Sequence, residues 1–242
     1  MKSAKLAASA AAAAAVVLAL SATGALARSS NSTQSSAAAA GTPSATSANE
    51  TRNATKHVSD AMAELRVMES DPHVKDLLRQ SKGVFLVPDY GRAALGVGGQ
   101  GGAGALLVHS HARWEGPAFY NFGGASIGLE AGAAGGQTAL ILMDDKALQA
   151  FGQANTFALN ADAGLTIVDW SARAHGSAGH GDIVAWSRTK GLFGNASISV
   201  TDINFDRSET AAYYGHAVTP GDVVAGLATS SRASRLLHML PA

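Results

Sequence analysis

The sequence predicts an α+β protein rich in β-structure, with one curved or barrel-like antiparallel sheet and with N-terminal and peripheral helices. Glycine accounts for 27 of the 242 residues and charged residues for only 15%, a composition typical of sheets with tight turns rather than of helical bundles. Apolar residues first recur every three or four positions, and after Gly83 they recur every second position. The many glycines allow the sheet to curve strongly.

The N-terminal 52 residues are predicted to lie outside the folded domain. Residues 1–27 combine two early lysines, an apolar run at 7–20 and an Ala-Leu-Ala cleavage pattern, which is typical of a secretory signal peptide. We therefore expect an exported protein, either periplasmic or secreted, and peripheral association with a membrane stays open. Residues 28–52 are Ser- and Ala-rich with few bulky apolar side chains, which predicts a disordered linker. Residues 53–242 are then one domain.

Two helices are expected at the start of this domain. Val58, Met62, Leu65 and Met68 share one face of a helix over 54–70. The sequence Ser-Asp-Pro at 70–72 predicts a stop and a new start. A second helix over 73–81 would then have an apolar face and a basic face. The basic residues on and just after it are Lys75, Arg79 and Lys82.

Strands and short helices are expected after Gly83. Strands are predicted at 84–87, 93–97, 105–108, 138–143 and within 119–129, and a helix capped by Asp144 at 144–151. Clear alternation predicts further strands at 156–168 and 196–205. The alternation of the latter run changes phase at Thr201 and Asp202, which indicates a β-bulge. Helical turns should follow at 208–214, 220–225 and 230–240.

Composition excludes several classes of function. The chain contains no cysteine, which excludes disulfides, thiolate catalysis and cysteine-ligated metals. Its formal charge is zero, and nucleic-acid-binding domains normally carry a strongly basic surface. We therefore expect no nucleic-acid partner. We expect no cofactor and no metal either, since the motif-like patterns described next lack the context that such sites need.

Three local patterns resemble chemical motifs without the context those motifs need. Residues 96–101 have the glycine spacing of a dinucleotide loop, but no helix start follows. Ser126 lies in a G-x-S-x-G pattern, but the glycine-rich stretch after it is a poor helix start, and a nucleophile elbow needs one. His109 and His111 could chelate a metal together with His175 or His180. Glycine-rich strands and exposed histidines explain all three patterns more simply.

Six segments in order resemble the SYLF domain family, a lipid-binding module with bacterial and eukaryotic members. They lie at 81–88, 96–104, 114–128, 160–165, 190–193 and 213–215. The resemblance covers about residues 53–228. The resemblance places the glycine and Ser126 patterns inside family β-structure. Glu115 and Glu130 stand where family members often carry Ser and Gln, which would add acid to this surface.

The resemblance implies a non-enzymatic protein that binds lipid. Eukaryotic members bind phosphoinositides, and some bind or bundle actin; for an exported protein, actin is not expected as a partner. Family members are thought to contact lipid through an N-terminal amphipathic helix and nearby basic residues, which here correspond to the helices before Gly83 and to Lys82. We therefore expect anionic phospholipid or phosphoinositide-like headgroups to meet basic side chains, while apolar side chains enter the acyl boundary or cover a groove. The expected lipid-binding residues are Lys75, Arg79, Lys82, Lys190, Val58, Met62 and Leu65.

Two other functions stay open at this stage. The first is a structural module of the cell envelope or of host interaction, with a protein ligand. The second is a hydrolase that uses Ser126. Binding to anionic lipid should weaken with salt, whereas binding to a protein need not. The sequence does not determine the oligomeric state.

Overall fold

The computed structural model describes residues 45–110, 112–153, 156–159, 164–170, 181–191 and 200–241.

Two N-terminal helices form one layer of the fold. Helix α1 covers Ala45–Met68 and helix α2 covers Pro72–Gln80. The Asp71 side chain accepts a hydrogen bond of 2.9 Å from the His73 amide and so caps α2. Helix α1 thus begins eight residues before the expected start of the domain, because its first turns pack beside helix α5 (Arg207–Tyr214).

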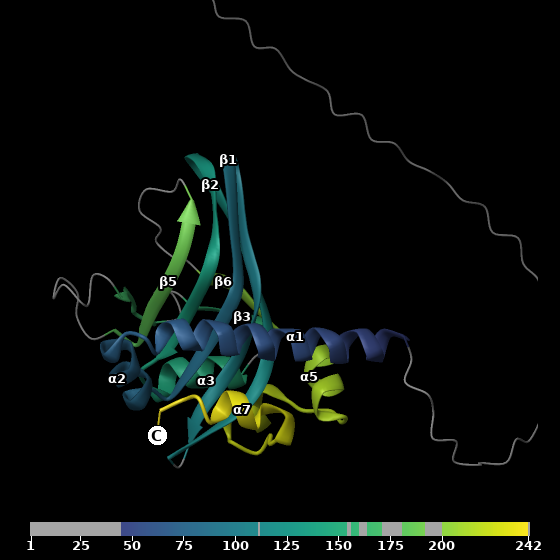
Figure 1. Ribbon diagram of the computed structural model, residues 1–242. Helices are drawn as coiled ribbons and strands as arrows, with labels where there is room; N and C mark the ends of the chain where they lie inside the picture. Colours follow the sequence, from purple (N-terminus) through teal and green to yellow (C-terminus); the bar gives the residue numbers. More distant parts are fainter. Residues whose placement is uncertain are drawn as a thin grey trace, which may run out of the picture. The chain divides into compact units, whose positions relative to one another are not determined.

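Two long paired strands dominate the sheet (Figure 1). Strand β1 covers Gly83–Ser110 and strand β2 covers Arg113–Leu142, and they are antiparallel along their whole length. Strand β1 doubles back on itself, since the His109 amide donates a hydrogen bond of 2.9 Å to the Lys82 carbonyl. The two parts of β1 also approach closely at Gly104, since a Cβ at this position would lie only 2.3 Å from the Leu86 carbonyl oxygen. The short strands expected between 84 and 143 are therefore parts of two continuous, bent strands.

Four shorter strands extend the sheet on both sides. They are β3 (Thr156–Leu159), β4 (Ile167–Asp169), β5 (Ile183–Gly191) and β6 (Val200–Phe205). The strand order is β3-β6-β2-β5-β4, with β1 also paired to β2. The predicted α+β class with a curved sheet is confirmed. One pair, β4 with β5, is parallel rather than antiparallel, because the run expected at 156–168 contains two separate strands.

The predicted bulge in β6 is confirmed by the register. Phe157 pairs with Ile203, but Leu159 pairs with Val200, so β6 carries one residue more than β3 between these pairs. The extra residue lies at Thr201 or Asp202, where the alternation changes phase. Ile203 and Phe205 consequently point into the core.

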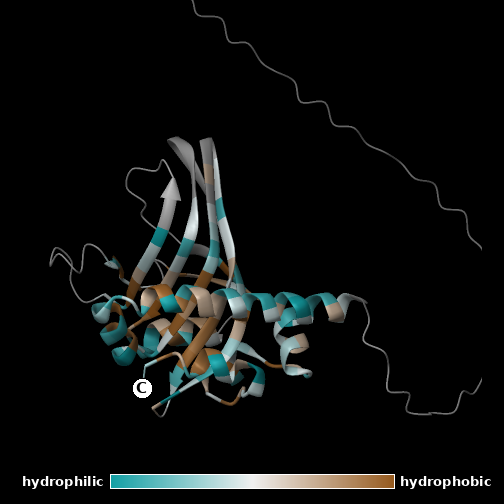
Figure 2. Ribbon diagram, viewed as in Figure 1, coloured by the Kyte–Doolittle hydropathy of each residue, from teal (hydrophilic) through white to brown (hydrophobic). Residues whose placement is uncertain are grey.

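The sheet has an apolar core on each face. Helices α3 (Asp145–Gln153) and α6 (Pro220–Val224) cover one face, with Phe151 and Val223 fully buried. Helices α1, α2, α5 and α7 (Ser234–Leu237) lie against the other face. Figure 2 shows the hydrophobic residues concentrated where the helices cover the sheet. Adjacent strand residues such as Phe85 and Leu86 serve opposite cores.

Local side-chain caps begin two of the helices that follow β2. The Asp144 carboxylate accepts from the Ala147 amide at 2.8 Å and caps α3 as expected. Thr219 and Asp222 form a capping box at α6. A short 3₁₀ helix (Ser231–Ala233) leads into α7. Among the described residues, no helix is both long and apolar enough to cross a membrane.

Candidate functional site

The structure brings three of the four expected basic residues together around α2. The Arg79 guanidinium lies 2.6 Å from the Asp76 carboxylate, and the Lys82 amine lies 3.6 Å from Asp145. Lys75 lies on the same helix and is half-buried. The backbone of Lys190 pairs with Gly135 far from α2 in the sequence, and its side chain lies outside the described residues. Two of the three clustered cations are therefore partly balanced by acids beside them.

The expected apolar residues face the sheet. Val58 and Leu65 are 7% and 0% exposed and belong to the core between α1 and the sheet, whereas Met62 is half-buried. Their contacts are with protein atoms while α1 stays in this position. Entry of Val58 or Leu65 into a membrane would require α1 to leave the sheet, and only Met62 lies near the surface.

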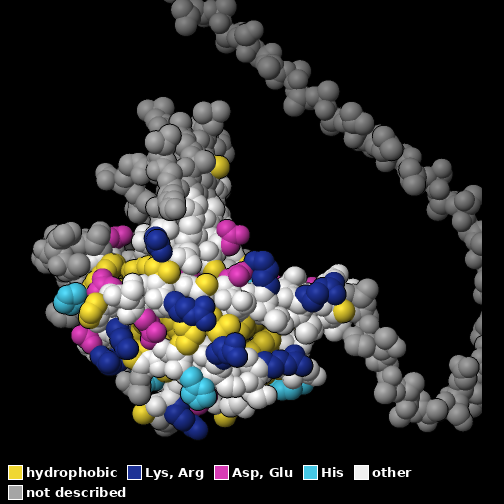
Figure 3. Space-filling model, in the orientation of Figure 1, with side chains coloured by type: hydrophobic (Ala, Val, Ile, Leu, Met, Phe, Trp, Pro, Cys, Tyr) yellow, Lys and Arg dark blue, Asp and Glu magenta, His cyan; other side chains and the backbone are white. Residues whose placement is uncertain are grey.

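Further cations lie on the same side of the fold and were missed by the sequence analysis. Arg66 in the last turn of α1, Arg232 in the 3₁₀ helix and Arg235 in α7 are all exposed. Figure 3 shows several Lys and Arg side chains gathered over α1 and the segments below it. The signal was hidden because about 170 residues separate Arg66 on α1 from Arg235 on α7, and only the contact between α1 and α7 brings these two elements together.

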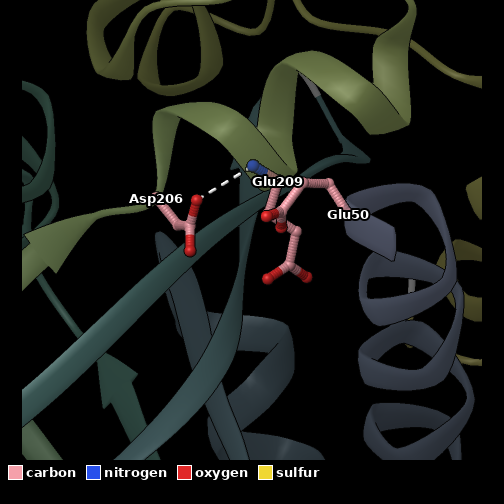
Figure 4. A group of neighbouring side chains, drawn as sticks. All are labelled: Glu50, Asp206 and Glu209. Atoms are coloured by element: carbon pink, nitrogen blue, oxygen red, sulfur yellow. Dashed lines mark hydrogen bonds between the residues drawn. The ribbon is translucent and has the colours of Figure 1, made fainter. Parts of the chain in front are cut away.

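An acidic cluster lies between α1 and α5. Oxygen atoms of Glu50, Asp206 and Glu209 all lie within 4.8 Å of one another (Figure 4). The Asp206 carboxylate caps α5 by accepting from the Glu209 amide at 2.9 Å, and it also accepts from Asn121 at 3.0 Å. The Glu209 side chain hydrogen-bonds to His57 Nδ1 at 2.6 Å. Carboxylates of this kind suit a hard cation chemically, but helix capping and the His57 bond already account for Asp206 and Glu209.

The hydrogen bond between His57 and Glu209 shifts the proton affinity of both groups. The hydrogen bond that the Glu209 carboxylate accepts from the His57 ring raises the pKa of His57 above its ordinary value. Burial raises the pKa of Glu209, and this effect outweighs the lowering effect of His57. The pair therefore ties α1 to α5 through a partly buried and strong hydrogen bond.

The three motif-like patterns do not form the sites that they resemble. Residues 96–101 lie within β1, and Ser126 lies within β2, opposite Gly98. A nucleophile elbow needs a turn from strand to helix, which β2 does not make at this point. The His109 ring stacks on Trp114 at 4.6 Å and its Nδ1 lies 3.1 Å from the Ser81 carbonyl oxygen. His111, His175 and His180 lie outside the described residues.

A cleft lies at the turn between β1 and β2. One hollow, of about 230 Å³, is lined by residues 113–116, 228–231 and Leu237. A second hollow, of about 490 Å³, shares Arg113, Trp114, Ser230, Ser231 and Leu237 with the first and adds Leu240. Glu115 lines the first hollow and is only 8% exposed, so the expectation that it adds acid to the surface is wrong. The side chain of Glu130 is not described.

Comparison with known proteins identifies the family. Residues 123–242 match the model of a family described as Ysc84, Las17-binding protein actin regulator. The chain belongs to this family, the SYLF family. The resemblance seen in the sequence motifs is thereby confirmed.

Curated relatives in yeast support the assignment. The protein named LAS seventeen-binding protein 3, from Saccharomyces cerevisiae strains YJM789 and ATCC 204508 / S288c, is 24% identical to this SYLF chain over 185 residues. The alignment covers 74% of this chain and 40% of the relative. This chain thus aligns with less than half the length of those relatives. No solved structure matches it.

The comparison corrects one expectation about partners. The sequence analysis does not expect actin as a partner, because it predicts an exported protein. The matching family is described as an actin regulator and the yeast relatives are named for binding Las17, so this expectation is wrong. It depended only on the predicted signal peptide, which lies outside the described residues.

Proposed function

We propose that this SYLF protein is a non-enzymatic binding protein that attaches to anionic phospholipid surfaces through the basic side of its helical layer. The observation that carries the proposal is the group of exposed cations on α1, α2 and the C-terminal helices (Figure 3). The family is described as an actin regulator and the yeast relatives are named for binding Las17, which supports a binding role and does not mention lipid.

The binding residues fall into two groups. Lys75, Arg79 and Lys82 form the group around α2, and Arg66 and Arg235 form the group on α1 and α7. A lysine or arginine near an anionic surface contributes about 1 kcal/mol. Arg79 and Lys82 contribute less than this because Asp76 and Asp145 lie beside them. No acid among the described residues forms an ion pair with Arg66 or Arg235, so this second group should carry more of the binding.

Vesicle sedimentation tests both groups. Reversal of Arg66 and Arg235 to Glu should weaken binding to phosphatidylglycerol vesicles by more than tenfold, which is the effect of losing about 2 kcal/mol. Reversal of Lys75, Arg79 and Lys82 should weaken it less. Arg188→Glu is the matched control, because Arg188 is also exposed but lies on β5. Equal binding by all variants, or binding that does not fall with salt, would contradict the proposal.

Export stays part of this proposal. The basic start, apolar run and small-residue site within 1–27 support a secretory signal peptide. Cell fractionation with detection of the mature N-terminus tests it. If the protein is recovered in the cytoplasm with Met1 still present, both export and a periplasmic or secreted location are rejected.

A protein partner related to actin regulation is the second candidate. The description of the family and the name of the yeast relatives favour it. Co-sedimentation with filamentous actin tests direct binding. If the Arg66→Glu and Arg235→Glu variants bind filaments as well as the unchanged protein does, the surface that binds actin differs from the proposed lipid-binding surface.

A further inference from the structure

Helix α1 lies across the long strands and carries a carboxylate on its buried side (Figure 1). Glu64 is 0% exposed, and neither of its oxygen atoms has a hydrogen-bond partner among the residues that the structure describes. Ala61 and Met68, which lie three residues before it and four residues after it, are fully buried in the core between α1 and the sheet. Glu64 therefore belongs to the buried face of α1, where a carboxylate is normally paired.

Among the described residues, no charge on the elements that pack against α1 compensates for Glu64. These elements are β1, β2, α5 and α7. Burial is the cause that raises the pKa of Glu64 well above its usual range. The tyrosines on these elements are neutral below pH ~9. The charged side chains and the histidine described on them form no hydrogen bond with Glu64; they are Asp89, His109, Arg113, Glu115, Arg207, Glu209 and Arg235.

The burial of Glu64 limits how its ionised form can be stabilised. Both oxygen atoms are buried, so water or a ligand can reach them only if α1 separates from the sheet. An ionised carboxylate without a partner is costly in such a place, whereas the same group is hydrated on a separated α1. Loss of the proton from Glu64 therefore favours separation of α1 from the sheet.

A second titratable contact of α1 depends on pH in the same direction. His57 lies about two turns before Glu64 on the same side of α1, and its Nδ1 atom lies 2.6 Å from Glu209 on α5. Because the hydrogen bond to Glu209 raises the pKa of His57, the contact is strongest at low pH and weakens as pH rises through the raised value. Other charges act on this pair from Lys56, Asp60, Glu50 and Asp206. Both titratable groups therefore hold α1 most firmly at low pH.

We propose that α1 packs over the sheet while Glu64 is protonated and separates from the sheet as Glu64 ionises, so that one buried carboxylate controls access to this face of the sheet. Separation exposes the apolar side of α1, including Val58 and Leu65, together with the sheet residues beneath it. This opening requires no lipid, so it stands apart from the proposed membrane binding and can be tested without vesicles.

The dependence of this opening on pH has a defined size and range. An opening that is linked to the loss of one proton becomes up to about tenfold more frequent per pH unit, from the ordinary carboxyl pKa of 4.5 up to the raised pKa of the packed state. His57 adds little below its ordinary pKa of 6.5. The interval from pH ~5 to pH ~6.5 therefore isolates the effect of Glu64.

Thiol labelling of single-cysteine variants measures the opening in the full chain, even when the open form is a minor one. The chain contains no cysteine, so a maleimide reacts only at the introduced position. Val58→Cys places the thiol on the buried face of α1, and Ser59→Cys places it on the exposed face. The ratio of the two labelling rates removes the intrinsic dependence of thiol chemistry on pH. We expect this ratio to rise about tenfold from pH ~5 to pH ~6.5.

Two controls assign the opening to Glu64 and to α1. Glu64→Gln keeps the shape of the side chain but cannot ionise, so in this background the ratio should change by less than about twofold; if Glu64→Gln fails to fold, Glu64→Met should show the same loss of pH dependence. Val223→Cys lies in the core on the other face of the sheet, and its labelling relative to Ser59→Cys should stay constant. The proposal is overturned if the ratio stays constant in the protein that keeps Glu64, if it rises equally without Glu64, or if Val223→Cys shows the same rise.

Discussion

Replacing Glu64 by methionine should stabilise the protein. Glu64 lies in α1 and is 0% exposed, and neither carboxylate oxygen has a hydrogen-bond partner among the described residues. Burial raises the pKa of this carboxyl well above its usual range. Methionine has a similar length and adapts its shape to a core, so Glu64→Met removes the polar group without a large cavity.

The size of the gain follows from the cost of burying an unpaired polar group. That cost is about 1–3 kcal/mol, and in a domain of this size each kcal/mol changes the melting temperature by about 2–4 °C. A gain of about 2 kcal/mol would raise it by about 4–8 °C. Because the folded pKa of Glu64 is raised, the folded state is favoured most below the ordinary carboxyl pKa and loses stability as pH rises. The gain should therefore be larger at pH ~8 than at pH ~5.

Urea unfolding, followed by tryptophan fluorescence at both pH values, measures this gain. Asp60→Asn is the matched control, because Asp60 lies one turn away on α1, is partly exposed and pairs with Lys56 at 2.5 Å. The control should change the free energy of unfolding by about 0.5 kcal/mol or less. If Glu64→Met lowers stability at high pH, or if its gain does not depend on pH, the reasoning about Glu64 is refuted.

Three other changes test the packing of α1 and of the sheet. Leu65→Ala should lower the free energy of unfolding by about 2–5 kcal/mol, because Leu65 is fully buried on the sheet-facing side of α1; a loss under about 1 kcal/mol in urea titration would show that α1 packs loosely on the sheet. His57→Gln should lower stability near pH ~6 but not near pH ~9, since the raised pKa of His57 makes its contribution full below its ordinary value of about 6.5 and lost as pH rises through the folded value. A loss that is the same at both values would contradict this. Gly104→Ala should cost about 1–3 kcal/mol in thermal unfolding because its Cβ would meet the Leu86 carbonyl, whereas Gly99→Ala, which has open space, should cost much less.

Local sequence signals were reliable where the deciding contacts are local. The Asp71 cap and the proline after it place the start of α2, and Asp144 caps α3 through the Ala147 amide three residues on. The bulge in β6 also follows from local alternation, because pairing with β3 forces Ile203 and Phe205 to the same face. Family membership was accessible from the order of six short motifs, although each motif alone is weak.

The candidate sites depend on contacts that the local sequence does not record. Lys75 and Arg79 lie on α2 and Lys82 lies just after it, so the three were expected together. Asp76 and Asp145 lie beside Arg79 and Lys82 and reduce the effect of these two cations. Arg66 and Arg235 lie on one side only because α1 contacts α7. The apolar face of α1 was predicted correctly, yet its residues meet the sheet instead of the surface.

The sequence by itself determined the α+β class, the two N-terminal helices, the cap of α3 and the family. It did so because side-chain periodicity and capping act within a few residues. The tertiary structure alone decided that β1 doubles back, that α1 begins at Ala45, and that Glu115 lies in a cleft rather than on the surface. These features depend on burial and pairing between residues far apart in the chain. A single carboxylate such as Glu115 has the same local sequence whether it is exposed or enclosed, and only the elements that pack around it decide which.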